Sequence, residues 1–250
     1  MTALQSMAIP TTQDTYEKDG YILKPGLLGD DKIGLLENTV AQLMGIPSDA
    51  DLIAGLQAME QKDKQRFYQI CTGDLWYTVA ALSLMADPKL VAAVGKCANT
   101  EPGRLSPVGY GLFWNDPTCP RLHYTWHQEA PCYPGMHDVV SVWFPMVYNL
   151  TPESGAMLLA RGSQKQALDF VRIPQHLGVT QMEIDDQIAE KFEPVNCAID
   201  RGDVVIFHQN TIHKTGENLS KRPRLSGIIR YADLTKEDKK TPYWSINPQF

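Results

Sequence analysis

The chain has 250 residues, and its 23 Lys and Arg residues against 29 Asp and Glu residues give a formal net charge of −6. The length allows a sizeable core, and the acidic balance argues against a nucleic-acid-binding protein, which normally has a basic surface. Residues 139–147 form the longest nearly apolar run, which is too short to cross a membrane, and residues 1–10 lack the basic and apolar regions of a signal peptide. The five Cys residues are scattered, without a Cys-x-x-Cys pair, as is typical of reduced thiols, so we expect a cytoplasmic protein.

Up to about residue 102 the sequence pattern is mostly helical. Residues 30–44 place apolar side chains at three- and four-residue steps, which predicts one buried helix face. Two further helices are predicted over residues 74–85 and 88–97. Asp74 suits the N-cap of the first, and Pro88 suits the first position of the second. A strand is expected earlier, at residues 20–23.

From about residue 103, short runs of β-branched and aromatic residues alternate with turn residues, which is typical of β-strands. We predict strands over residues 107–114, 122–129, 139–150, 156–160, 195–199, 203–208, 211–215 and 222–233. Helices do not alternate with these runs, so the pattern favours a mainly β fold, a sandwich or jelly roll, with flanking helices packed on one sheet. We expect a single domain: a helical part over residues 1–102, a β core over 103–233 and a C-terminal tail over 234–250.

His127 and Glu129 are two residues apart in the motif Trp-His-Gln-Glu at positions 126–129. On a strand such residues point to the same face, so an imidazole and a carboxylate would lie side by side. A second His from another strand would complete a set of two His and one carboxylate, which leaves metal positions open and suits non-heme Fe(II) and O2 chemistry. A His-x-Glu pair by itself is a weak signal, and a purely structural pair of strand residues remains the alternative.

Two His residues compete for the third ligand position, His208 and His213. Residues 217–220 are predicted as a hairpin loop, and a symmetric hairpin would place His213 opposite Arg224 on one face. The planar fork of an Arg bonds both oxygens of a carboxylate, so this pair could hold a dicarboxylate between the metal and Arg224. We therefore favour His213, and we expect His208 to be a core residue or to lie behind the ligands. Two hydroxyl side chains would share the face, Thr215 and Ser226.

Two other basic side chains and one loop lie close to this proposed face. Arg222 and Arg230 share the face of Arg224 if the strand is regular, and Arg222, nearer the loop, is expected to be solvated. Residues 130–138 leave the metal face as a loop, and loops in this position often contact substrate, although a plain turn is an equal interpretation. The candidate contacts in the loop are Cys132, Tyr133 and His137.

Several motifs occur in a fixed order between about residues 107 and 233. They are Trp-His-Gln-Glu at 126–129, Val-Trp at 142–143, Asn-Leu-Thr-Pro-Glu-Ser-Gly-Ala at 149–156, Arg-Gly-Ser-Gln-Lys at 161–165, and the stretch from Gly-Asp at 202–203 through His213 to Arg224. Together they resemble the phytanoyl-CoA dioxygenase (PhyH)-like family of Fe(II)/2-oxoglutarate-dependent oxygenases. The resemblance implies a double-stranded β-helix, or jelly-roll, core.

The resemblance also implies roles for individual residues. His127, Glu129 and His213 match the iron ligands of the family. Arg224 matches the residue that binds the distal carboxylate of 2-oxoglutarate. Two further positions match residues near the co-substrate in the family, Thr215 and Trp143, and Ser226 is added as a candidate because it shares the expected face of Arg224. The family usually has Asp where this chain has Glu129, whose longer side chain still reaches a metal if the backbone lies slightly further back.

The implied activity is oxidation, most simply hydroxylation, of an unactivated C–H bond in a small metabolite or natural-product intermediate. The implied cofactors are Fe(II), 2-oxoglutarate as co-substrate, which becomes succinate and CO2, and O2, with ascorbate as a candidate reductant. We expect a small-molecule substrate, no nucleic-acid or membrane partner, and a monomer or homodimer. Two alternatives remain: a cupin-type metal enzyme that does not use 2-oxoglutarate, and a non-catalytic jelly-roll binding module.

Overall fold

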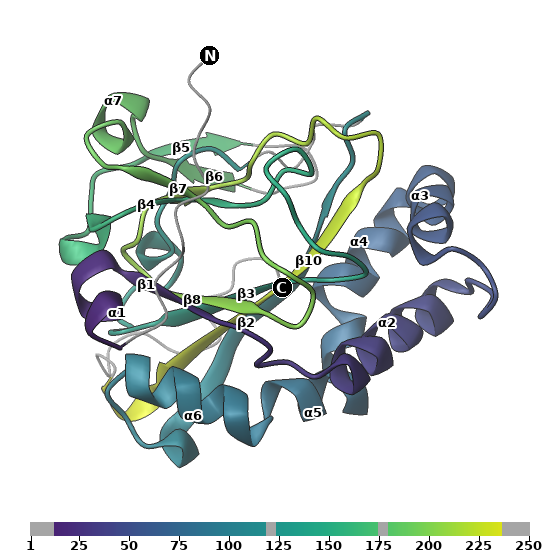
Figure 1. Cartoon of the computed structure of the whole chain (residues 1–250), viewed down its shortest axis with the longest axis horizontal. Helices are drawn as coiled ribbons and strands as arrows, with labels where there is room; N and C mark the ends of the chain where they lie inside the picture. Colours follow the sequence, from purple (N-terminus) through teal and green to yellow (C-terminus); the bar gives the residue numbers. More distant parts are fainter. Residues whose placement is uncertain (1–12, 119–123, 175–179, 237–250) are drawn as a thin grey trace.

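The computed structural model describes residues 13–118, 124–174 and 180–236. Helices dominate the N-terminal part of the chain (Figure 1). They are α1 (Gln13–Asp19), α2 (Asp30–Met44), α3 (Leu52–Lys62), α4 (Lys64–Thr72), η1 (Asp74–Tyr77), α5 (Val79–Met85), α6 (Pro88–Cys97) and η2 (Pro102–Arg104). Short helices later in the chain are η3 (Ala130–Cys132), η4 (Ser163–Lys165), α7 (Asp186–Ala189) and η6 (Leu234–Lys236).

Helices α2 and α6 begin and end at the predicted residues. Ile33, Leu36 and Val40 form the buried face of α2. The prediction for residues 74–85 is wrong at its start, because Asp74 opens a 3₁₀ turn and Thr78 instead caps α5, accepting a hydrogen bond from the Ala81 N–H at 3.3 Å.

The strands form two main antiparallel sheets. The first has five strands in the order β1 (Tyr21–Lys24), β8 (Val204–His208), β3 (Val140–Pro145), β10 (Arg224–Asp233) and β2 (Leu105–Asn115). The second has three, in the order β7 (Pro194–Asn196), β4 (Leu158–Ala160) and β9 (His213–Lys214). A separate pair joins β5 (Val171–Pro174) to β6 (Thr180–Glu183).

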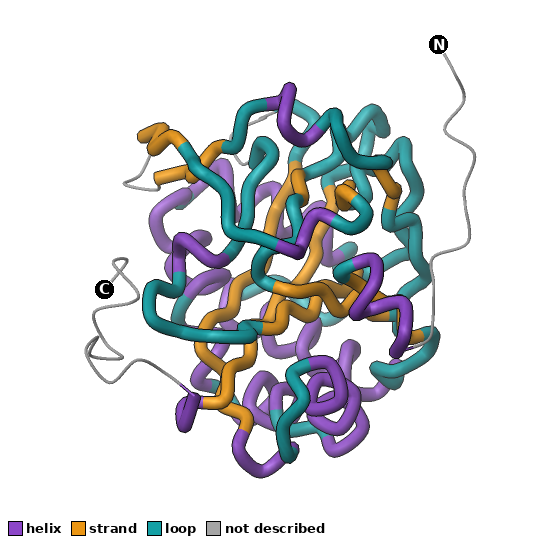
Figure 2. The backbone as a smooth tube through the Cα atoms, turned by 90° about the vertical axis from the view of Figure 1, so that its left-hand side faces the viewer, coloured by secondary structure: helices purple, strands orange, loops and turns teal. Residues whose placement is uncertain are grey.

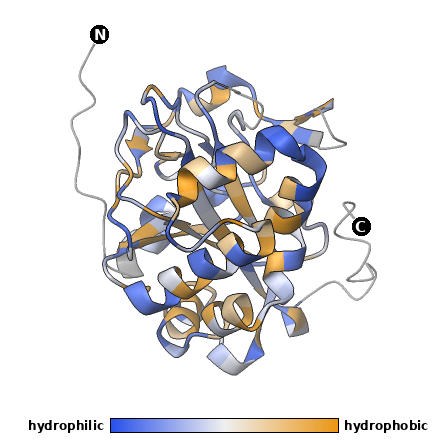
Figure 3. Cartoon of the chain, turned by 90° about the vertical axis from the view of Figure 1, so that its right-hand side faces the viewer, coloured by the Kyte–Doolittle hydropathy of each residue, from blue (hydrophilic) through white to orange (hydrophobic). Residues whose placement is uncertain are grey.

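Side chains alternate between the two faces of the five-stranded sheet. One face packs on the helices, with Ile22, Val142, Phe144, Ile206 and Ile229 buried in a core shared with α2, α4, α5 and α6 (Figure 1). The helices carry hydrophobic and hydrophilic residues on different sides, as amphipathic elements do (Figure 3).

The opposite face of this sheet packs on the three-stranded sheet. Trp143, Val205, Phe207 and Ile228 are buried there against side chains of β4 and β7. Connecting loops gather on the side of the molecule away from the helices (Figure 2). The two facing antiparallel sheets, which do not close into a barrel, give the jelly-roll fold that was predicted.

Two predicted strands need correction. The strand over 139–150 ends at Pro145, because Pro offers no N–H to a ladder and Val147 adopts a φ of 68°. Residues 124–129 form no regular strand, and only His127 makes an isolated β-bridge, while residues 122 and 123 lie outside the described residues. The other predicted strands match observed ones with ends that differ by at most three residues, but β5, β6 and α7 were not predicted.

The predicted hairpin between residues 213 and 224 is wrong. β9 pairs with β4, with His213 opposite Leu159, whereas β10 pairs with β2 and β3, with Arg224 opposite Asn115. The two segments therefore belong to opposite sheets, and the loop between them crosses from one sheet to the other. Arg224 still faces the interior between the sheets, because it shares the inner face of β10 with Ile228. No helix among the described residues is long and apolar enough to span a membrane.

Candidate active site

Three side chains that can bind a metal converge between the two sheets. His127, Glu129 and His213 each offer one ligand atom, and these atoms lie within 4.8 Å of one another. Glu129 and His213 are 3 % and 4 % exposed. The described residues contain no other cluster of this kind. Two imidazoles and one carboxylate match the ligand set of non-heme Fe(II) oxygenases.

Backbone hydrogen bonds hold the ligand-bearing segments together. The His127 N–H donates to the His213 carbonyl, and the His213 N–H donates to the His127 carbonyl, both at 3.0 Å. The Glu129 N–H donates to the Gln209 carbonyl at 2.8 Å. Residues 127–129 therefore run beside residues 209–213, and this pairing positions His127 and Glu129 without a regular strand.

Gln128 lies between the two ligands and fixes their orientation. It is 1 % exposed. Its amide nitrogen donates to the carbonyls of Gln166 and Asn210, and its amide oxygen accepts a hydrogen bond from the Leu168 N–H. Both polar atoms of this amide thus bind backbone groups away from the metal-binding cluster. His127 and Glu129, on either side of Gln128 in the sequence, both point toward the cluster, as the two-residue spacing predicted.

Both imidazoles are held in the tautomer that a metal requires. Nδ1 of His127 lies 2.7 Å from the Thr125 carbonyl oxygen, and Nδ1 of His213 lies 2.9 Å from the Thr211 carbonyl oxygen. A carbonyl only accepts hydrogen bonds, so Nδ1 carries the proton and Nε2 keeps its lone pair. Backbone partners of this kind are the usual second contact of a metal-binding His. The residues present therefore fit an Fe(II) ion.

The protonation states also suit metal binding. Burial, together with the neighbouring His213, lowers the pKa of His127 to about 3, so the imidazole is neutral at physiological pH. Burial alone would raise the pKa of Glu129, but the Arg230 guanidinium outweighs this effect and holds that pKa well below its ordinary range. Glu129 is therefore an ionised carboxylate in the apoprotein.

Arg230 is a site residue whose contact with Glu129 was not predicted from sequence. Its Nη2 lies 2.5 Å from Oε1 of Glu129, and the two side chains are 12 % and 3 % exposed. Its guanidinium carbon lies 6.0 Å from the centre of the Tyr133 ring, which also places one of the predicted loop contacts at the site. The available signal was its position on the same strand face as Arg224, six residues further along β10.

Arg224 lies on the same inner face of β10, six residues before Arg230. It is 3 % exposed, one of its Nη atoms donates to the Gly155 carbonyl, and its Nε has no partner among the described residues. No carboxylate in the described part of the chain forms an ion pair with it. Burial lowers the pKa of Arg224 to about 10, so it remains a cation at neutral pH.

Gly155 gives this carbonyl its position. Its φ is +78°, and a Cβ there would lie 2.8 Å from the Gly216 carbonyl oxygen. Only glycine adopts this conformation in so close an approach. The Thr-Pro-Glu-Ser-Gly segment, residues 151–155, thus brings a hydrogen-bond acceptor to Arg224.

The remaining predicted residues lie in or beside the same interior. Ser226 is fully buried, and its hydroxyl has no partner among the described residues. Trp143 is 4 % exposed and packs in the core between the sheets. Thr215 is half-buried just after β9, and its N–H donates to the Tyr124 carbonyl at 2.9 Å.

Other candidates lie apart from the ligands. His208 is outside the cluster, where its Nδ1 accepts a hydrogen bond from the Asn210 N–H at 3.1 Å. Arg222 is half-exposed and pairs with Asp51, as expected for a solvated residue. Cys132, by contrast, lies beside Glu129: its N–H donates to the Glu129 carbonyl at 2.8 Å, and its sulfur packs against that of Met182 at 3.9 Å.

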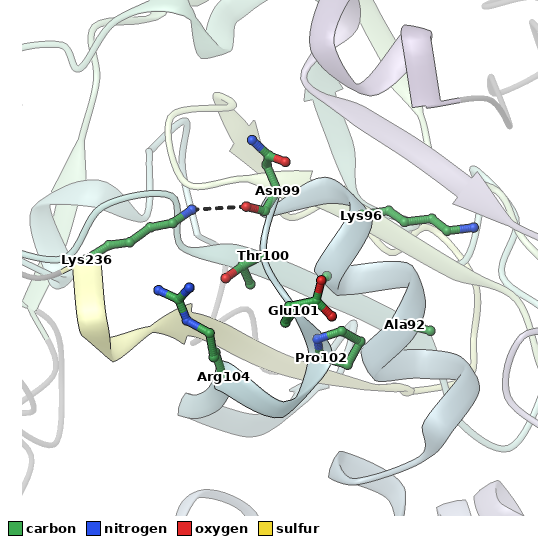
Figure 4. Close-up of a pocket in the computed structure, with 9 residues that line it drawn as sticks. Ala92, Lys96, Asn99, Thr100, Glu101, Pro102, Arg104 and Lys236 are labelled. Atoms are coloured by element: carbon green, nitrogen blue, oxygen red, sulfur yellow. Dashed lines mark hydrogen bonds between the residues drawn. The ribbon is translucent and has the colours of Figure 1, made fainter.

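A surface hollow of about 490 Å³ lies beside α6 and η2, and it is a separate feature (Figure 4). Two of its basic side chains are already engaged. Arg104 pairs with Asp233 at 2.9 Å, and Lys236 donates to the carbonyls of Ala98 and Asn99. These two cations are therefore not free to bind an anionic ligand.

Comparisons with known proteins find relatives in sequence and in fold. Ectoine dioxygenase from Bordetella parapertussis (strain 12822) is 22% identical over 263 aligned positions, which cover 94% of this chain and 78% of that protein. The structure of EctD from S. alaskensis with 2-oxoglutarate and 5-hydroxyectoine has a TM-score of 0.65 at 15% identity, covering 99% of this chain and 88% of that one. The epimerase SnoN, solved with Fe3+, alpha ketoglutarate and nogalamycin RO, has a TM-score of 0.64 at 16% identity, covering 88% and 82%. These two structures share the fold.

The family model for phytanoyl-CoA dioxygenase (PhyH) matches residues 16–226, which is most of the chain. The match includes all three residues of the metal cluster and Arg224. The predicted family, the iron and 2-oxoglutarate requirement and the enzyme class are thereby confirmed. The chain belongs to the phytanoyl-CoA dioxygenase (PhyH) family and is a 2-oxoglutarate-dependent non-heme iron dioxygenase.

Proposed function

We propose that this enzyme hydroxylates an unactivated C–H bond of a small metabolite or natural-product intermediate. In this proposal His127, Glu129 and His213 hold the iron, and Arg224 binds the distal carboxylate of 2-oxoglutarate. Bound iron supplies the oxidative chemistry, in which O2 and 2-oxoglutarate are consumed and succinate, CO2 and the hydroxylated product are formed.

One observation carries the proposal. The interior between the two sheets contains both a cluster of two imidazoles and one carboxylate and a buried guanidinium that has no carboxylate partner among the described residues. A buried unpaired charge is costly, so its presence indicates a ligand of opposite charge. A dicarboxylate with a keto group next to one carboxylate can meet the metal at one end and Arg224 at the other.

The chain's own residues have distinct tasks in this scheme. Arg224 and the hydroxyl of Ser226, which is two residues along the same face, bind and orient the co-substrate. The Thr125 and Thr211 carbonyls hold a proton on each Nδ1, so that Nε2 of each imidazole keeps its lone pair for the metal. Apolar side chains in the core between the two sheets, such as Trp143 and Phe207, exclude water from that space.

The direct test is an anaerobic titration of the metal-free protein with Fe(II) and then with 2-oxoglutarate. We expect a visible charge-transfer band that saturates at about one equivalent. His213→Gln should abolish iron binding while leaving the fold intact, because its role is ligation. His208→Gln is the matched control, since His208 is a half-buried histidine outside the cluster, and it should bind iron normally.

Two results would contradict the proposal in different ways. Iron binding without the 2-oxoglutarate band would leave a metal enzyme of the cupin type. If the unaltered protein does not bind iron, the protein is a non-catalytic binding module, or its metal ligands are a different set of residues. Once the band is established, 2-oxoglutarate turnover in the presence of candidate small molecules identifies the substrate, and mass spectrometry of the product shows whether one oxygen atom has been added.

A further inference from the structure

Arg230 is buried against the carboxylate of Glu129, and its position suggests more than charge neutralisation. We propose that Arg230 is a positioning residue that clamps the Glu129 carboxylate in the orientation in which it would meet the metal. The inference rests on the proposed function, because it concerns how one of the three ligands is presented. No other basic side chain in the described residues forms an ion pair with Glu129, apart from the ligand His213 itself.

The two oxygens of Glu129 are in different situations. Oε1 lies 2.5 Å from Nη2 of Arg230 and 3.5 Å from Nε2 of His213. Oε2 has neither of these contacts. A charge-assisted hydrogen bond to a buried guanidinium is among the stronger contacts in a protein, so Arg230 holds the carboxylate with Oε1 turned toward the imidazole of His213.

The clamp also explains how this chain uses Glu where the family usually has Asp. Glu has one more rotatable bond than Asp, so it can present its carboxylate in more orientations. The ion pair with Arg230 removes that freedom. Gln128 and the hydrogen bond from the Glu129 N–H to the Gln209 carbonyl fix the backbone, and Arg230 fixes the far end of the side chain.

Arg230 is itself held by its neighbours on the sheet. It lies opposite Gly109 of β2 and Ser141 of β3. A Cβ at Gly109 would lie 2.0 Å from the Tyr133 hydroxyl oxygen and 3.3 Å from Cδ of Arg230. The missing side chain at Gly109 therefore leaves the space in which Tyr133 packs beside the guanidinium.

The first test compares Arg230→Gln and Arg230→Lys with the unaltered enzyme, using Co(II) as the metal probe. Without metal, Arg230→Gln leaves Glu129 buried without its partner, so the melting temperature should fall by roughly 10 °C. Co(II) supplies a new partner, so metal should raise the melting temperature more in the variant than in the unaltered enzyme. The Kd of 2-oxoglutarate for the Co(II) form should rise about tenfold. Arg230→Lys keeps the charge without the planar fork and should give intermediate values.

A glycine pair provides the second test. Gly109→Ala pushes Tyr133 away from Arg230, and it should weaken 2-oxoglutarate binding in the same direction as Arg230→Gln. Gly111→Ala is the matched control on the same strand, because a Cβ there makes only ordinary contacts, the nearest at 3.5 Å from Phe113. The control should bind 2-oxoglutarate as the unaltered enzyme does. The Co(II) absorption spectrum, which reports coordination number, should change in Gly109→Ala and not in Gly111→Ala.

The outcomes separate this inference from the proposed function. If Arg230→Gln lowers the melting temperature equally with and without Co(II), and changes the 2-oxoglutarate Kd less than twofold, Arg230 is only structural and the inference fails. If the unaltered enzyme binds neither metal nor 2-oxoglutarate, the proposed function is wrong, and the inference that rests on it is wrong as well. A larger metal-induced stabilisation in the variant, with weaker co-substrate binding, supports the clamp.

Discussion

Replacing Arg224 with Met should stabilise the apoprotein and weaken co-substrate binding at the same time. Met is similar in length to the Arg stem and has no charge, so Arg224→Met removes the buried guanidinium without leaving a large cavity. The guanidinium is 3 % exposed and has no carboxylate partner in the described part of the chain. The apoprotein therefore contains a charge that only a ligand can neutralise.

The size of the effect follows from the pKa of Arg224. Burial lowers this pKa from 12.5 to about 10. Each pKa unit corresponds to about 1.4 kcal/mol, so the buried charge costs the folded apoprotein about 3 kcal/mol at neutral pH. The folded pKa is depressed for a basic group, so this cost is fully present below pH 10 and is relieved only above it.

The hydrogen bond to Gly155 partly offsets that gain. Its loss in Arg224→Met costs about 1 kcal/mol. The net stabilisation is then about 2 kcal/mol, or an increase of about 4 °C or more in melting temperature. The lost charge-assisted bonds to 2-oxoglutarate are worth roughly 3 kcal/mol together, which raises the Kd about 100-fold.

The assay pairs thermal unfolding of the metal-free protein with titration of 2-oxoglutarate into the Fe(II) form under anaerobic conditions. Arg222→Met is the control, because Arg222 is half-exposed and pairs with the exposed Asp51 at 3.2 Å. It should change stability by less than about 1 kcal/mol and leave 2-oxoglutarate binding unchanged. A destabilised Arg224→Met variant with normal 2-oxoglutarate affinity would refute the reasoning, since Arg224 would then be a structural residue.

Two further predictions concern stability. The pKa of His127 is about 3 in the folded protein and near 6.5 when unfolded, so between these values the unfolded chain binds more protons and stability falls as pH falls. We expect urea denaturation to show a loss of about 2 kcal/mol between pH 8 and pH 5, and His127→Asn should remove most of that slope; an unchanged slope would contradict the pKa. Gly155→Ala should destabilise by about 1–3 kcal/mol in thermal unfolding, because it combines a φ of +78° with a Cβ 2.8 Å from the Gly216 carbonyl oxygen. Gly26→Ala shares the positive φ, +58°, but meets no atom within 4 Å, so an equal loss there would show that the close approach adds nothing.

Local patterns in the sequence were sufficient for many elements of the fold. The periodic apolar residues of α2 and the Asp-Pro start of α6 determine those helices at short range. The β-branched runs predicted most strands to within a few residues. Pairing between distant segments was not predictable in this way, and the hairpin between residues 213 and 224 failed because each segment found a different partner strand.

For the candidate site, too, some features were predictable from local sequence and others depended on tertiary structure. The two-residue spacing of His127 and Glu129 placed both on one side of the chain, although the segment is a loop held by an isolated bridge to His213. Arg224 was identified with a hairpin register that is wrong, but the inner face of β10 still directs it into the interior. The choice of His213 over His208 likewise agrees with the observed cluster.

The sequence by itself determined the chemistry that is available: two imidazoles, a carboxylate and an arginine in a spacing that a jelly roll can bring together. Only the tertiary structure decided which groups share the interior, because that depends on the packing of two sheets whose strands are far apart in the chain. The contact between Arg230 and Glu129 joins residues 101 positions apart. No local sequence pattern predicts a contact over that distance, because the contact forms only when folding places β10 next to the loop after His127.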